Sequence, residues 1–169
     1  MAVLRYLYPE QLDDFVTSVN NINEMQVALG RWVDENEPQE AVVATNDIGA
    51  IAFFGNRPIV DTIGLIDPEV IRRRRLDNPT KAMIDYFKQR GVTHALLFTN
   101  WHPDILLDPH LKYVHRVVLE DNVVCGGDTM LVSVLDWDLN DESIEKPPWF
   151  DEERENCEYY LRYKKILGF

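Results

Sequence analysis

The sequence predicts a layered α/β protein with a mixed sheet. Three short apolar segments, at residues 42–45, 59–65 and 95–98, are separated by helical patterns. This alternation is typical of parallel strands in a three-layer, Rossmann-like arrangement. Residues 111–121 and 128–138 alternate apolar and polar side chains, which predicts an antiparallel pair. We therefore expect parallel inner strands followed by a terminal antiparallel hairpin.

The first expected helix spans residues 23–36, and a proline follows it as a stop signal. Its apolar residues recur at helical spacing, namely Ile22, Met25, Leu29, Trp32 and Val33. The apolar run at 42–45 is predicted to be a strand buried on both faces. Residues 48–55 are expected to form a short helix or turn that ends at Gly55.

The second strand is expected within residues 57–66, and two helices follow it. Each helix is predicted to start at a capping residue followed by proline, at Asp67 and at Asn78. The second of them ends at Gly91, a residue type typical of a helix C-terminus. A third strand, a helical turn at residues 102–108 and the hairpin then complete the domain.

We expect one α/β domain over residues 1–138, followed by an acidic linker and a C-terminal helix over residues 139–169. With 169 residues and 46% hydrophobic content, the chain is long enough to bury one sizeable core. The composition turns acidic after residue 138, and the final segment is acidic first and basic last, which suits a helix dipole.

The charge of the chain excludes some partners. A net charge of -12 should repel nucleic-acid phosphates and anionic lipid surfaces, so no nucleic-acid partner is expected. Four consecutive arginines, at 72–75, form the concentrated positive patch. Consecutive helical residues point in different directions, so a solvated face with ion pairs is favoured over contact with lipid or partner phosphates. No apolar run approaches the roughly 20 residues of a membrane helix, and the chain as given is expected to be soluble.

No catalytic residue, metal site or cofactor is predicted. The four histidines match no H-E-x-x-H pattern, and the two cysteines form no C-x-x-C motif. A dinucleotide fingerprint would need G-x-G-x-x-G after the first strand, where the chain supplies Gly49 and Gly55 alone. Neither Cys125 nor Ser133 has a histidine and an aspartate at a recognisable spacing.

Asp47 is the first candidate for a ligand or docking site. It lies where the first strand ends and a helix begins, which is the position where open α/β sheets bind ligands. The same position is an N-cap, where a carboxylate accepts hydrogen bonds from the first free N–H groups of the helix. We favour the capping role over the ligand role.

Asp61 is the second candidate. Strand alternation places it on the same face as Ile59, Ile63 and Leu65, where an uncompensated charge would be costly. Three roles stay open: an ion pair with Arg57, a hydrogen bond to a backbone turn, or ligand binding. The full set of ligand or docking candidates is Asp47, Asp61, Arg57, Asn46 and Asp67.

Three motifs lie close together in the first half of the chain. They are a helix of the form Q…G-x-W…N-x-P at Gln26, Gly30, Trp32, Asn36 and Pro38, then D-I-G-A-I-A-F-F at residues 47–54, and I-V-D-x-I-G-L-I-D-P-E at residues 59–69. Together they resemble the soluble segment after the last membrane helix of bacterial and archaeal polytopic glycosyltransferases. These enzymes are of the lipid-linked-sugar type and are relatives of protein mannosyltransferases.

The resemblance implies a parent enzyme that transfers a sugar from a polyprenyl-phosphate donor outside the cytoplasm. The family's catalytic acid belongs to an early loop among the membrane helices, and no segment of this sequence matches that loop. We therefore expect an accessory domain at the extracytoplasmic face, non-catalytic alone, that positions a glycan or protein acceptor or docks on the membrane-embedded part. The alternative is an independent small α/β enzyme or nucleotide-binding protein that uses the edge with Asp47 and Asp61.

Overall fold

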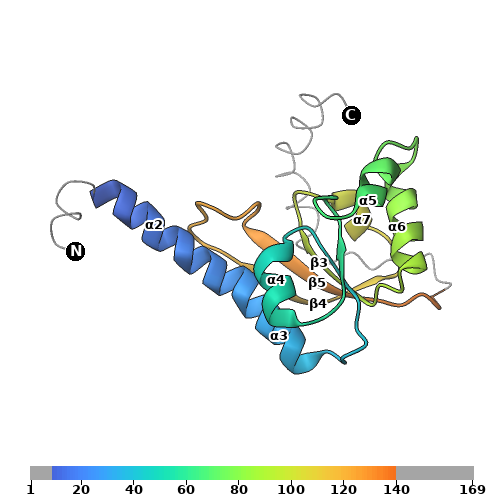
Figure 1. The fold of residues 1–169 in the computed structure, drawn as a ribbon, viewed down its shortest axis with the longest axis horizontal. Helices are drawn as coiled ribbons and strands as arrows, with labels where there is room; N and C mark the ends of the chain where they lie inside the picture. Colours follow the sequence, from blue (N-terminus) through green and yellow to red (C-terminus); the bar gives the residue numbers. More distant parts are fainter. Residues whose placement is uncertain (1–8, 140–169) are drawn as a thin grey trace.

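The computed structural model describes residues 9–139, which build a five-stranded sheet with helices on both faces (Figure 1). The strands are β1 (Val43–Thr45), β2 (Ile59–Asp61), β3 (His94–Phe98), β4 (Leu111–Val118) and β5 (Thr129–Leu135). Their order in the sheet is β2-β1-β3-β5-β4. β1 runs parallel to β2 and β3, whereas β5 runs antiparallel to β3 and β4. The predicted mixed sheet with a terminal antiparallel hairpin is confirmed.

A long helical stretch precedes the sheet. It consists of α2 (Pro9–Ile22), the π-helical turn η1 (Asn23–Val27) and α3 (Ala28–Asn36). The helix predicted for residues 23–36 is therefore present, but the helical stretch starts well before it. α2 extends away from the body of the domain, and Phe15 on it is exposed (Figure 1).

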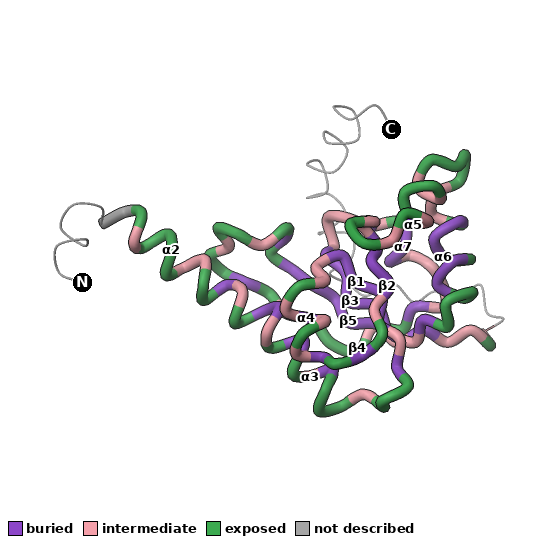
Figure 2. Tube along the Cα trace, in the orientation of Figure 1, coloured by how far each residue is buried: buried purple, intermediate pink, exposed green. Residues whose placement is uncertain are grey.

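Two apolar clusters hold helices to opposite faces of the sheet. Besides η1 and α3, these helices are α4 (Ile48–Gly55), α5 (Pro68–Arg73), α6 (Pro79–Gln89) and α7 (Pro103–Leu106). Successive residues of a strand point to opposite faces. Accordingly, Val43 of β1 packs with residues of η1, α3 and α4, whereas Ala44 packs with residues of α5, α6 and α7. The buried residues follow the strands and the inner sides of these helices (Figure 2).

α3 and α4 approach each other closely at Gly30. A Cβ at this position would lie 2.9 Å from the carbonyl oxygen of Ala50 and 2.9 Å from Cβ of Phe54. Real Cβ atoms are not found at such distances from backbone atoms, so glycine permits this contact. The contact fixes α4 against α3 and so fixes the residues at the carboxyl end of β1.

The second strand is shorter than predicted and lies at the edge of the sheet. β2 covers 3 residues rather than the predicted 59–65, and the strand order places it outside β1. The Asp61 carboxylate accepts the backbone N–H groups of Ile63 (2.9 Å) and Ile66 (2.8 Å), which folds the chain into a turn. The strand alternation predicted for Ile63 and Leu65 is therefore wrong.

The remaining expectations concern the ends of the chain. The linker and C-terminal helix expected for residues 139–169 fall outside the described residues, apart from residue 139. Over residues 9–139, no helix combines the length and the apolar character that crossing a membrane requires.

The contact at Gly30 gives a test by substitution. Gly30→Ala should lower the free energy of unfolding by about 1–3 kcal/mol, because the new methyl group would press on the backbone of Ala50. Gly49→Ala is the matched control, since a Cβ there meets nothing within 4 Å. The control should be neutral or stabilising by up to about 1 kcal/mol. Chemical denaturation of both variants measures the difference, and equal effects would contradict the close contact.

Candidate functional site

The carboxyl ends of the three parallel strands meet at one edge of the sheet, which we call the carboxyl edge. It includes Asn46 and Asp47 after β1, Asp61 and Thr62 at the end of β2, and the segment after Phe98 of β3. The chain leaves β1 towards β2 on one side and leaves β3 towards β5 and β4 on the other. In open α/β sheets, ligands bind where neighbouring strands diverge in this way.

Asn46 lies at the boundary between β1 and β3. Its side chain is buried, with 6% of the residue exposed, and Oδ1 accepts the N–H of Phe98 at 3.0 Å. The other end of the amide, Nδ2, is buried and has no hydrogen-bond partner among residues 9–139. A buried donor without a partner costs about 1–3 kcal/mol, so such an atom requires an explanation. A ligand atom that accepts a hydrogen bond at the carboxyl edge would provide one.

Asp47 occupies the N-cap position of α4 but does not cap the helix with its side chain. Instead, Oδ2 accepts a hydrogen bond from Nε2 of Gln26 at 2.7 Å. The predicted capping bond is therefore wrong, because a distant amide on η1 takes its place. The start of α4 is thus joined directly to η1, which precedes the sheet in the sequence.

Gln26 links three segments that are far apart in the sequence. Its side chain is buried in η1, where Nε2 donates to Asp47 and Oε1 accepts from the Cys125 thiol, with Sγ at 3.4 Å. Burial raises the pKa of the Cys125 thiol, and the charge of Asp47 adds to this shift. The thiol is therefore a hydrogen-bond donor rather than a nucleophile. π-helical turns recur at functional sites, and sequence analysis gave Gln26 no part in one.

Of the three roles left open for Asp61, the hydrogen bond to a backbone turn is present. The ion pair with Arg57 is wrong, because the Arg57 guanidinium instead contacts Asp34 Oδ1 at 3.2 Å. Arg57 also donates to five backbone carbonyl groups, those of Asp34, Glu37, Pro38, Gly55 and Asn56. Arg57 thus joins the ends of α3 and α4, and a ligand role for either residue stays a prediction.

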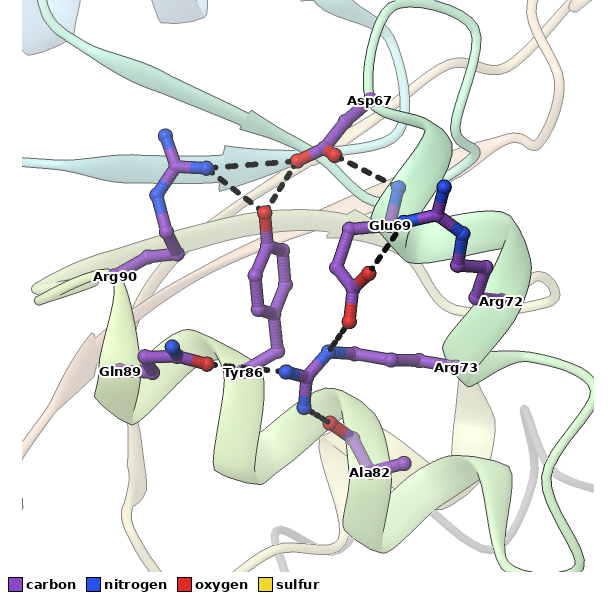
Figure 3. A network of polar contacts seen from close by, with 8 residues as sticks. All are labelled: Asp67, Glu69, Arg72, Arg73, Ala82, Tyr86, Gln89 and Arg90. Atoms are coloured by element: carbon purple, nitrogen blue, oxygen red, sulfur yellow. Dashed lines mark hydrogen bonds and ion pairs between the residues drawn. The ribbon is translucent and has the colours of Figure 1, made fainter.

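Asp67 begins α5 as the sequence predicts, with Oδ1 accepting the N–H of Glu69 at 3.1 Å. Its second oxygen accepts from the Tyr86 hydroxyl at 2.6 Å and lies 3.6 Å from the Arg90 guanidinium (Figure 3). Burial raises the pKa of Tyr86, and its hydrogen bond to Asp67 adds to this effect. Asp67 therefore belongs to a network between α5 and α6, separate from the contacts of Asn46 and Asp47.

Sequence reasoning missed a buried histidine next to the carboxyl edge. Nε2 of His102 lies 3.3 Å from Oγ1 of Thr62, and both residues are buried. Burial, together with the charge of Arg74, lowers the pKa of His102 to about 3, so the ring is neutral near pH 7. Neither the metal-ligand pattern nor the spacing of a catalytic triad singles out His102 in the sequence. Within the described part of the chain, no group of three His, Cys, Asp or Glu side chains could hold a metal ion.

The fold and this edge define a mixed α/β domain with polar side chains at the carboxyl ends of its parallel strands. A protein-family model matches residues 20–147, and the chain belongs to that family, which is described as "Domain of unknown function (DUF8728)". The match contains all five strands. No curated protein and no solved structure matches the sequence. The family description states no activity, so the glycosyltransferase resemblance stays a prediction.

The bond between Gln26 and Asp47 can be tested by stability measurements. Asp47→Ala should cost about 1–3 kcal/mol, because it leaves the buried amide of Gln26 without its acceptor. Asp47→Ser should cost a similar amount. If Asp47 capped the helix, the serine variant would have nearly the same free energy of unfolding as the unmodified chain. The double variant Gln26→Ala and Asp47→Ala should cost less than the sum of the single variants. Denaturant unfolding gives these values, with Asp13→Ala on α2 as the exposed control.

His102 predicts a pH dependence of stability. Its pKa in the folded protein, about 3, lies below the ordinary value of 6.5, so protonation favours the unfolded chain. The contribution of neutral His102 to the free energy of unfolding is fully present above about pH 6.5 and is lost as the pH falls towards 3. Between about pH 7 and about pH 5 the loss is about 2 kcal/mol. His102→Gln should remove this part of the pH dependence, and identical slopes for both proteins would contradict the assignment.

Proposed function

We propose that this chain is an accessory domain of a membrane glycosyltransferase of the lipid-linked-sugar type. It is non-catalytic alone and holds the acceptor at the carboxyl edge, next to the membrane-embedded part of the same enzyme. The parent enzyme acts at the extracytoplasmic face of the membrane. In this proposal the sheet serves as a Rossmann-like domain does, with ligand-binding groups at the carboxyl ends of parallel strands.

The observation that carries this proposal is that the three motifs similar to glycosyltransferase segments meet at the carboxyl edge. Gln26 of the first motif donates to Asp47 of the second, and Asp61 of the third forms the turn after β2. Gly30 of the first motif supports this edge through its contact with α4. Beside Asp47, Asn46 offers a buried donor that has no partner in the described chain.

The chemistry of the edge favours a neutral, hydroxyl-rich acceptor. A sugar hydroxyl both donates and accepts hydrogen bonds, and Asp47 and Asn46 supply an acceptor and a donor on adjacent residues. A nucleotide fits less well, because its phosphates would meet the Asp47 carboxylate at the start of α4 in a chain of net charge -12. Asp61 adds little to a nucleotide site, since both of its oxygens are bonded to backbone N–H groups.

Saccharide binding can be followed through individual side-chain amides by NMR. We expect neutral mono- and disaccharides to shift the side-chain amide signals of Asn46 and Gln26. The amide of Asn36 is the control, because it is bonded to Trp32 within α3 and should not move. Asp47→Asn should weaken the binding. Signals that stay unchanged throughout a titration with the whole panel would contradict an acceptor site at this edge.

Activity assays test the proposed role in catalysis. The purified chain should transfer no sugar from any polyprenyl-phosphate donor, and turnover by it would contradict the accessory role. In the parent enzyme, Asp47→Asn should raise KM for the acceptor with kcat unchanged, which is the signature of lost ground-state binding. A fall in kcat with KM unchanged would instead indicate a catalytic role for Asp47.

A further inference from the structure

An exposed surface beside α5 combines aliphatic and cationic side chains. We call it the α5 face, and its members are Leu65, Ile66, Ile71, Arg72, Arg75 and Leu76. Leu65 and Ile66 are 72% and 67% exposed, and Leu76 is 56% exposed. The loop with Leu65 and Ile66 lies against α5, since a Cβ on Gly64 would be 2.7 Å from Ile71. Apolar side chains gathered on an exposed surface mark an interaction site.

The carboxylates around the α5 face are already engaged in internal contacts. Glu69 pairs with Arg73 at 3.0 Å and with Arg72 at 3.2 Å, and Asp67 accepts from Tyr86 (Figure 3). Asp61 accepts hydrogen bonds from backbone N–H groups of the turn that follows it. These acidic groups therefore contribute little negative charge towards the solvent.

The four arginines divide into one pair that faces inward and one pair that faces outward. Arg73 donates to the carbonyl of Ala82 and to Gln89, and Arg74 donates to the carbonyl of Ile63. Arg72 and Arg75 are exposed, although Arg72 shares the Glu69 carboxylate with Arg73, and the exposed carboxylate of Asp77 comes directly after this segment. The outward charge of the α5 face is therefore positive although the chain as a whole is acidic.

The α5 face is also held in place. The Arg73 guanidinium lies 4.5 Å from the centroid of the Tyr86 ring, and Arg90 lies over the same ring at 5.6 Å. Together with the bonds of Asp67, these contacts fix α5 on α6 (Figure 3). The aliphatic side chains thus project from a supported helix and loop, at positions where internal packing does not require them.

We propose that the α5 face binds the surface of a lipid bilayer. Leu65, Ile66 and Leu76 enter the boundary between headgroups and acyl chains, and Arg72 and Arg75 pair with lipid phosphates. Aliphatic tips suit hydrocarbon, whereas the buried centres of protein interfaces are enriched in aromatic residues. The net charge of -12 does not prevent this contact, because charges farther than about 8 Å are largely screened at physiological ionic strength. The inference does not depend on the function proposed above.

Vesicle sedimentation tests the proposal with the full chain. The chain should bind vesicles of phosphatidylcholine mixed with phosphatidylglycerol, bind phosphatidylcholine alone more weakly, and lose affinity as salt is added. Leu65→Ser should weaken binding about tenfold through lost apolar burial. Arg75→Gln should weaken it about fivefold, as expected for one cation near an anionic surface.

Two variants serve as matched controls. Phe53→Ser removes an exposed apolar side chain on α4, and Lys112→Gln removes one positive charge on β4. Neither should change vesicle binding, and unfolding curves should show that Leu65→Ser and Arg75→Gln remain folded. Absence of binding to both kinds of vesicle, or equal losses in test and control variants, would overturn the proposal. So would self-association in sedimentation velocity that Leu65→Ser abolishes, because the α5 face would then be an interface between two copies.

Discussion

The buried guanidinium of Arg57 is the constraint on which the arrangement around the first two strands depends. The last carbonyl groups of a helix lack partners within the helix, and a cation is favoured near them. Arg57 satisfies carbonyl groups at the end of α3, in the following loop and at the end of α4 at the same time. The two helix ends are thereby held together, which makes the close approach at Gly30 possible. That approach in turn brings the start of α4 within reach of Gln26 on η1.

Much of the fold could be predicted because its signals are local. The apolar runs of β1 and β3, the proline starts of α5 and α6 and the alternation of the hairpin depend on residues close together in the chain. β2 was predicted too long for a physical reason. Residues 62–66 contain apolar types that favour strands, but the Asp61 carboxylate offers their backbone N–H groups a competing partner. A side chain that bonds to the backbone in this way outweighs a weak strand preference.

The candidate site was harder to predict because its contacts are long-range. Asp47 was placed correctly at the start of a helix, but its partner is Gln26, 21 residues earlier in the sequence. Arg57 was paired with the wrong carboxylate because strand spacing suggested a neighbour, whereas Asp34 is 23 residues away. No local pattern signals that the Nδ2 of Asn46 is buried and has no hydrogen-bond partner within residues 9–139, since this depends on how the ends of β1 and β3 meet. The aspartate- and glycine-rich motifs are thus mainly structural, and they support a small polar edge.

The π-helical turn η1 determines how α2, which precedes it in the chain, is rotated about its own axis. A π turn contains one residue more than the α-helical turn that it replaces, so it resets the rotation of everything that precedes it. Closing η1 into an ordinary helix by removal of one residue would rotate α2 by about 100° about its axis. Asn21, which holds the β4–β5 loop through Asp121 and Val123, would then face elsewhere. The extra residue therefore sets the rotation of α2 about its axis, so that Asn21 faces the β4–β5 loop.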